Sequence, residues 1–108
     1  MSLAEAVYHV TESFPKSEMF GLISQMRRAA VSVPSNIAEG KERGSDREFL
    51  RFLSISMGSL AELETQLILS QRLGYLRDAD KQVLAPLLDE TGKMLRSFKK
   101  RLEQKQGI

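Results

Sequence analysis

Residues 45–67 read SDREFLRFLSISMGSLAELETQL and contain the clearest helix pattern of the chain. The first four letters match a capping box, in which Ser45 bonds a backbone amide one turn on and Glu48 reaches back to the Ser45 amide. Apolar or small residues then recur every four and three positions: Phe49, Leu53, Ser56, Leu60, Leu63 and Leu67. A second stripe, about 100° round the helix, consists of Leu50, Met57, Ala61 and Ile68. The two stripes predict a helix over 46–73 with neighbours on more than one side.

The preceding segment has the same helical period, typical of helices that pack at shallow angles. Its stripe is Met19, Ile23, Met26, Ala30, Val33 and Ile37. We therefore predict a helix over 17–40. Pro34 lies inside this stripe and predicts a kink, with a complete break left open. Gly40 and Gly44 are expected to end the helix.

Two further helices complete the predicted fold. A short one over 4–13 must end before Pro15, because the residue before a proline is pushed out of the helical region. A longer one over 79–103 is expected to bend near Pro86. With tight turns between the helices, and with no strand-like alternation, the chain is predicted to be all-α. The expected architecture is an antiparallel, up-down-up-down four-helix bundle in a single domain over 1–108.

The composition removes much enzyme chemistry. The chain has no cysteine and one histidine, so thiolate nucleophiles, disulfides and Cys-ligated zinc are excluded. His9 shares a short helix with Glu5 and Glu12, but an ordinary charged surface explains this trio better than a metal site. One histidine also offers no credible catalytic triad. We expect no enzyme activity, metal, cofactor or small-molecule substrate.

The expected location follows from the hydropathy. No apolar run approaches the ~20 residues that a membrane span needs. The first residues, MSLAE, lack the basic start and the apolar stretch of a signal peptide. A cytoplasmic protein without membrane contact is therefore expected.

Charge is concentrated at the carboxyl end. The net charge is +2, but residues 93–108 carry six basic side chains and one acidic side chain. The candidate nucleic-acid contacts are Arg96, Lys99, Lys100 and Arg101, with Arg43, Arg47 and Arg51 as secondary candidates. Basic residues near a helix carboxyl end are also favoured by the helix dipole, so an ordinary solvated surface remains an alternative. Aromatic residues make up only 6% of the chain, which argues against a base-stacking platform.

Arg27 flanks the core stripe of its helix, and Glu64 lies about 60° from the core direction of the next one. A partly buried carboxylate needs a partner. Antiparallel pairing sets Arg27 within a turn of Glu62 and Glu64, which predicts a structural ion pair with one of them. Phosphate contact by Arg27 is the alternative.

One face of the helix predicted over 17–40 consists mostly of small, polar residues, and apolar residues flank it. Small residues permit close approach of another helix, so this face is a candidate subunit interface, with a solvated face as the equal alternative. Its residues are Ser24, Arg28, Ser32, Ser35 and Glu39.

Three runs resemble a known family. Residues 20–40 read FGLISQMRRAAVSVPSNIAEG, and the runs at 52–67 and 73–76 match as well. The chain resembles the four-helix-bundle family named for the 23S ribosomal RNA intervening sequence. The first helix is shorter than is usual in that family, and Pro86 and Gly92 are unusual for the fourth. The resemblance implies a cytoplasmic bacterial bundle, similar to the accessory protein of diversity-generating retroelements, a basic homopentameric ring that works with a reverse transcriptase and nucleic acid.

Together these observations predict a non-enzymatic homo-oligomer, a pentamer by resemblance. It is expected to bind RNA or a nucleoprotein partner through basic residues. The expected partners besides itself are RNA or DNA, and a nucleic-acid enzyme. The alternative is a ring that serves purely as a protein-binding scaffold or adaptor.

Overall fold

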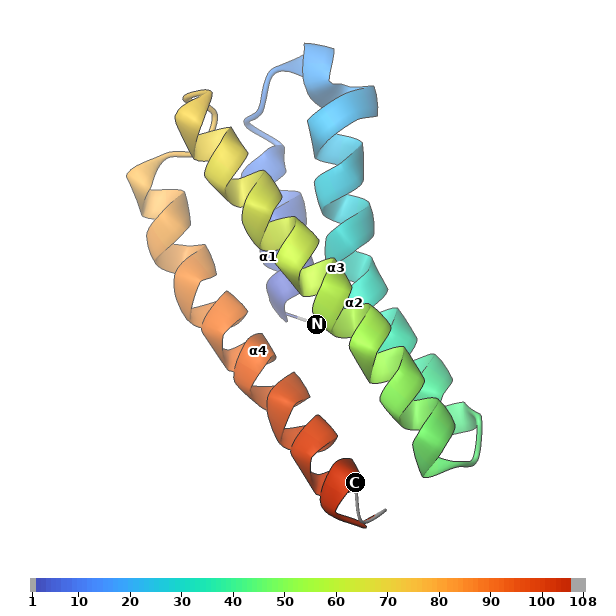
Figure 1. The fold of residues 1–108 in the computed structure, drawn as a ribbon. Coiled ribbons are helices and arrows are strands. Elements are labelled where there is room, and N and C mark those ends of the chain that lie inside the picture. The colour runs from blue at the N-terminus through green and yellow to red at the C-terminus, as the bar shows by residue number, and fades with distance from the viewer. Residues whose placement is uncertain (1, 106–108) are drawn as a thin grey trace.

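The computed structural model describes residues 2–105, apart from the side chain of Ser2, and contains helices and turns with no strand in that range. Residues 1 and 106–108 of the predicted domain lie outside the described residues. The four main helices are α1 (Ser2–Thr11), α2 (Ser24–Glu42), α3 (Asp46–Arg72) and α4 (Asp78–Lys105) (Figure 1). A short 3-10 helix, Lys16–Glu18, and a π-helical turn, Met19–Ile23, precede α2.

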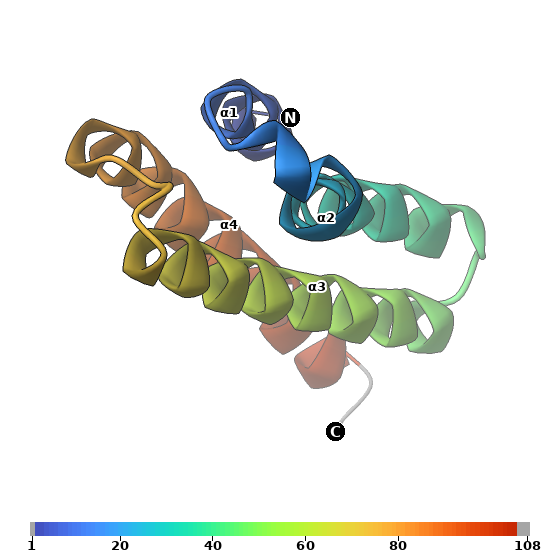
Figure 2. The ribbon, with the colours of Figure 1, turned by 90° about the horizontal axis from the view of Figure 1, so that it is seen from above.

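The helices form an antiparallel four-helix bundle, as predicted. Each helix packs against its two neighbours in the order α1, α2, α3, α4 and back to α1, with α2 and α3 in the most extensive contact (Figure 2). Because α1 is short, it covers only the half of the bundle that holds the α3–α4 turn (Figure 1). The opposite end is built from α2, α3 and α4.

The core combines side chains from all four helices. The completely or almost completely buried ones include Val7, Met26, Val33, Leu53, Leu63, Leu84 and Leu95. The first predicted stripe of α3 is buried, apart from half-buried Phe49. The second stripe is only partly covered, because Ala61 and Ile68 are exposed. The bundle therefore covers only part of the second stripe of α3.

The entry to α2 departs from the predicted continuous helix over 17–40. Gly21 has non-helical dihedral angles, φ −111° and ψ −109°, inside the π-helical turn. This break shifts the helical phase, so Met19 is 42% exposed although the stripe placed it in the core. Tyr75 Oη donates a hydrogen bond to Glu18 Oε2 at 3.1 Å, which fixes the turn to the α3–α4 connection.

Close contact between α2 and α3 explains the small residues in both helices. Ser56 Oγ donates to the Val33 carbonyl at 2.8 Å, one residue before Pro34, and α2 continues through the proline to Glu42. A Cβ on Gly40 would lie 2.8 Å from Phe52 Cβ. Gly40 is thus a packing glycine inside the helix, and its predicted role as a helix end is wrong. Gly44, with φ +81°, takes the left-handed conformation after α2.

Candidate nucleic-acid interface

The two predicted basic clusters meet at the end of the bundle that α1 does not cover. Lys105 Nζ lies 3.3 Å from Asp46 Oδ2, and the Phe49 and Phe98 rings are 6.0 Å apart. Lys41 Nζ, from the last turn of α2, lies 5.6 Å from the centre of the Phe98 ring. We call this region the basic end and define it as Lys41, Arg43, Arg47, Arg51, Lys99, Lys100, Arg101 and Lys105.

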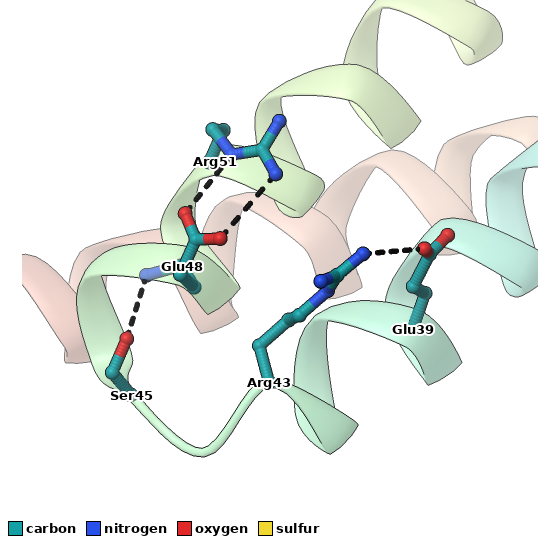
Figure 3. A network of polar contacts seen from close by, with 5 residues as sticks. All are labelled: Glu39, Arg43, Ser45, Glu48 and Arg51. Carbon is teal, nitrogen blue, oxygen red and sulfur yellow. Dashed lines mark hydrogen bonds and ion pairs between the residues drawn. The ribbon is translucent and has the colours of Figure 1, made fainter.

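The arginines around the α2–α3 turn are held by local carboxylates (Figure 3). Arg43 Nη2 lies 2.9 Å from Glu39 Oε1. Arg51 donates from Nε and Nη2 to the two oxygens of Glu48, at 3.0 and 3.3 Å. Ser45 Oγ accepts from the Glu48 amide at 3.2 Å, as the capping box predicts, while the Glu48 carboxylate is directed to Arg51 (Figure 3).

Both of these arginines also cover Phe52. Their guanidinium carbons lie 5.1 Å (Arg43) and 4.5 Å (Arg51) from the ring centre, and Phe52 is 5% exposed. The hydrogen bond from Arg51 lowers the pKa of Glu48 and raises that of Arg51 itself. Residues 39–51 carry four basic and four acidic side chains, so the excess positive charge of the basic end comes from α4.

The predicted cluster on α4 consists of side chains in different surroundings. Lys99 is half-buried and Lys100 exposed, and neither has an ion pair in the part of the chain that the structure describes. Arg101 lies over Phe98, 5.0 Å from the ring centre. Arg96 instead lines a hollow of about 300 Å³ that also contains Glu64 and Asp89. Arg96 therefore lies beside carboxylates, away from its predicted companions.

Arg47 is the one secondary candidate without a carboxylate partner among residues 2–105. It is exposed and follows Asp46, the residue that Lys105 contacts. Arg47, Lys99 and Lys100 are therefore the cations of the basic end that have neither a carboxylate partner nor a ring contact among residues 2–105, since Lys41 and Arg101 lie over Phe98.

The predicted pairing of Arg27 with Glu62 or Glu64 is wrong. Arg27 Nε donates to Thr11 Oγ1 at 2.9 Å and Nη2 to the Tyr8 carbonyl at 3.4 Å, with the guanidinium 4.6 Å from the Tyr8 ring centre. Glu62 and Glu64 are exposed. The guanidinium is instead held by α1, through the Thr11 hydroxyl, the Tyr8 carbonyl and the face of the Tyr8 ring.

The candidate interface strip on α2 is also divided by the structure. Ser32 Oγ lies 2.8 Å from Ser59 Oγ in the α2–α3 contact, and Glu39 pairs with Arg43. Ser35 remains exposed. Ser24 and Arg28 line a separate hollow near the start of α2.

That hollow contains a residue that sequence reasoning did not select. Phe20 is 98% exposed, the largest exposed fraction among the large apolar residues that the structure describes. The Phe20-Gly21 pair, at the start of an otherwise regular stripe, was the only available indication of a break there.

Within residues 2–105, no three His, Asp or Glu side chains gather where they could hold a metal ion. The helices in this range are also too short or too polar to cross a membrane.

Comparison with known proteins places the chain in a family. The family model described as 23S rRNA-intervening sequence protein matches residues 1–97. The chain belongs to this family. A search of the curated proteins gave no match. The match to the 23S rRNA-intervening sequence protein family includes α1, α2, α3 and most of α4, and ends before Lys99. Lys99, Lys100, Arg101 and Lys105 thus lie beyond the matched region.

Proposed function

We propose that this member of the 23S rRNA-intervening sequence protein family is a non-enzymatic helical bundle that binds RNA through its basic end. The observation that carries the proposal is that the basic segment of α4 meets the arginines of the α2–α3 turn at one end of the bundle, where the Lys105–Asp46 contact joins the two. The carboxyl-terminal part of α4 contributes Lys99, Lys100, Arg101 and Lys105 to this end.

Phosphate contact is the mode of recognition that this surface favours. Arg47, Lys99 and Lys100 have no compensating carboxylate among residues 2–105, so their charge can neutralise phosphates. Phe52 and Phe98 of this end lie beneath cations, Phe52 being 5% exposed and Phe98 half-buried, and the half-buried Phe49 ring packs against Phe98. Because the basic end has no fully exposed ring for base stacking, this surface reads backbone charge and shape more than base sequence.

Self-assembly would strengthen such binding. We propose a homo-oligomer, pentameric by the family resemblance, in which each copy adds its own basic end. Several modest patches on one ring bind a polyanion more tightly than one patch does. A cytoplasmic location, and partnership with a nucleic-acid enzyme, belong to the same proposal.

The second candidate function is a protein-binding scaffold without nucleic-acid contact. Exposed Phe20 (98%) and Ile68 (55%) favour it, because exposed apolar side chains can mark protein interaction surfaces. Here the basic end would be an ordinary solvated helix end.

Fluorescence anisotropy separates the two candidates. Labelled structured RNA and duplex DNA of equal length would be titrated with the protein at about 50 and about 200 mM salt. The proposal expects RNA binding that weakens steeply with salt. Equal binding of DNA would widen the ligand to nucleic acid in general, and absence of binding to both at low salt would favour the scaffold.

A further inference from the structure

Phe20 is the one aromatic side chain of residues 2–105 whose ring has no partner. It is 98% exposed and lies neither against another ring nor under a cation of the described residues. The other aromatic side chains in that range make ring–ring or cation–ring contacts: Tyr8, Phe14, Phe49, Phe52, Tyr75 and Phe98. Exposing a phenylalanine forgoes the free energy that burial would supply, so a free ring in a fixed position indicates a binding partner.

The turn that carries the ring is fixed to the bundle. Glu18 Oε1 accepts a hydrogen bond from the Leu22 amide at 3.4 Å, and Glu18 Oε2 accepts one from Tyr75 at 3.1 Å. Leu22 and Ile23, which follow the ring, are buried. The backbone on both sides of Phe20 is therefore anchored. Glu18, the one acidic residue of 16–23, has both of its carboxylate oxygens in use.

Phe20 lines a hollow of about 350 Å³ whose walls include two arginines and no acidic residue. Besides Phe20 itself, the lining residues, which we call the Phe20 surface, are Tyr8, Met19, Ile23, Ser24, Arg27 and Arg28. A cavity of about 150 Å³ holds a benzene ring, so this hollow has room for a planar group of two fused rings.

The two arginines of the Phe20 surface have no carboxylate partner among residues 2–105. Arg27 donates to uncharged groups, the Thr11 hydroxyl and the Tyr8 carbonyl, so its positive charge is not neutralised. Arg28 is exposed and makes no hydrogen bond or ion pair with the described residues. The surface thus combines a free ring face with uncompensated positive charge, and it favours a ligand that is both aromatic and anionic.

We propose that the Phe20 surface binds a nucleotide, with its base stacked on the Phe20 ring and its phosphate at Arg28. Aromatic rings beside basic side chains hold unpaired nucleotides in this way, whereas the bases inside a duplex are not accessible to such a ring. An unpaired segment of RNA and a free mononucleotide offer this same chemistry. The inference rests on the proposed RNA binding and deepens it, because the basic end then contacts the backbone while this surface contacts an unpaired base.

The Phe20 surface and the basic end can be tested separately. They lie at opposite ends of α2, which has 19 residues, so about 28 Å of helix separates them (Figure 1). An RNA trinucleotide is shorter than this separation. A trinucleotide on the Phe20 surface therefore cannot reach the basic end of the same chain.

The probe is a single-stranded RNA trinucleotide with 2-aminopurine at its centre, because stacking on a ring quenches the fluorescence of this base. Titration with the wild-type protein at about 50 mM salt should quench it saturably. Phe20→Leu removes the ring but keeps an apolar side chain, and it should weaken binding by about 5-fold or more, the lower limit for one stacked base. Phe20→Tyr keeps a ring and should retain the affinity.

The phosphate contact is tested with Arg28→Gln, which should reduce the slope of log K against log salt by about 0.7. The matched control is Arg72→Gln, which removes the same charge from an exposed position outside the hollow and should bind as the wild type does. Circular dichroism would verify that each variant keeps its helices. Competition with adenosine monophosphate identifies the source of the nucleotide. Displacement at an equal nucleotide concentration indicates a free mononucleotide, and weaker displacement indicates an RNA segment.

The basic-end variant Lys99→Gln/Lys100→Gln/Arg101→Gln separates this inference from the proposed function. It should bind the trinucleotide as the wild type does and lose affinity for structured RNA. Three results would overturn the nucleotide site: no quenching by the wild type, equal binding by Phe20→Leu, or a control as weak as Arg28→Gln. If structured RNA still binds through the basic end, the nucleotide site alone is wrong and Phe20 is left to a protein partner. If neither RNA binds, the proposed function fails as well.

Discussion

Lys105 Nζ lies 3.3 Å from Asp46 Oδ2, which joins the last turn of α4 to the first turn of α3. The contact pairs a cation at a helix carboxyl end with an anion at a helix amino end, and each helix dipole favours its own member. Both side chains are partly exposed, so the pair contributes at most about 1 kcal/mol to folding. The contact shows that the basic segment of α4 lies beside the α2–α3 turn.

Gly40→Ala tests the close contact of α2 and α3. The new Cβ would lie 2.8 Å from Phe52 Cβ and 3.0 Å from Phe49 Cδ1, so the helices must separate or Phe52 must shift. Overpacking of this kind costs about 1–3 kcal/mol, which exceeds the roughly 1 kcal/mol that alanine contributes to a helix. Urea denaturation should show no gain in the free energy of unfolding and a net loss of up to about 2 kcal/mol.

The matched control is Gly58→Ala in α3. A Cβ there meets no atom within 4 Å, so only the helix preference acts and stability should rise by about 0.5–1 kcal/mol. Equal effects of the two substitutions would contradict the packing role of Gly40.

Arg27→Ala tests the attachment of α1. The substitution removes two hydrogen bonds to α1 and the contact over the Tyr8 ring. Thr11 Oγ1 keeps its own bond to the Val7 carbonyl, at 2.8 Å, so no buried polar atom loses its last partner. We expect a loss of about 1–2 kcal/mol by urea denaturation. Glu62→Gln and Glu64→Gln should change stability by less than about 0.5 kcal/mol, and a large loss from either would restore the ion-pair interpretation.

Asp80 predicts an acid-sensitive start of α4. Hydrogen bonds from the Arg77 side chain and amide, at 3.0 to 3.2 Å, lower the pKa of this buried carboxyl below its ordinary value of 3.8, with a smaller contribution from His9 of α1. Because the folded-state pKa is the lower one, the stabilisation is present above pH 3.8 and is lost as the pH falls through the folded value.

Asp80→Asn should therefore be less stable than wild type at neutral pH, and the difference should shrink below about pH 4. Thermal unfolding followed by circular dichroism between pH 7 and pH 2.5 measures this convergence, with exposed Asp78→Asn as the control. If the stability difference does not change with pH, the charge of Asp80 does not contribute to stability, and the prediction is wrong.

Local patterns predicted the helices well, because a cap or a stripe is set by residues within a few turns. Ser45 caps α3 as its spacing indicates, and the α3 stripe that includes Leu53, Leu60 and Leu63 is buried as expected. Gly40 was misassigned because a glycine near a helix end fits both a cap and a close crossing. Only the position of Phe52 on the next helix decides between them.

The candidate site was less predictable because it depends on side-chain rotation and on neighbours distant in sequence. Arg27 flanks the core stripe as predicted, but its guanidinium bonds to Thr11 and Tyr8 of α1, which are 16 and 19 residues away in the sequence. Arg96 shares a cluster with Lys99 in sequence, yet in the fold it lines a hollow that Glu64 and Asp89 also line. The exposure of Phe20 follows from the non-helical Gly21, which a periodic stripe cannot show.

The most direct test of the central claim is the salt dependence of RNA binding by Lys99→Gln/Lys100→Gln/Arg101→Gln. The control is Lys16→Gln/Arg72→Gln/Lys81→Gln, which removes the same charge from exposed positions at the other end of the bundle. Each lost phosphate contact should reduce the slope of log K against log salt by about 0.7–0.9, so the basic-end variant should lose about 2–3 in slope. The control should bind as the wild type does. Equal slopes and affinities for all three proteins would contradict RNA recognition by the basic end.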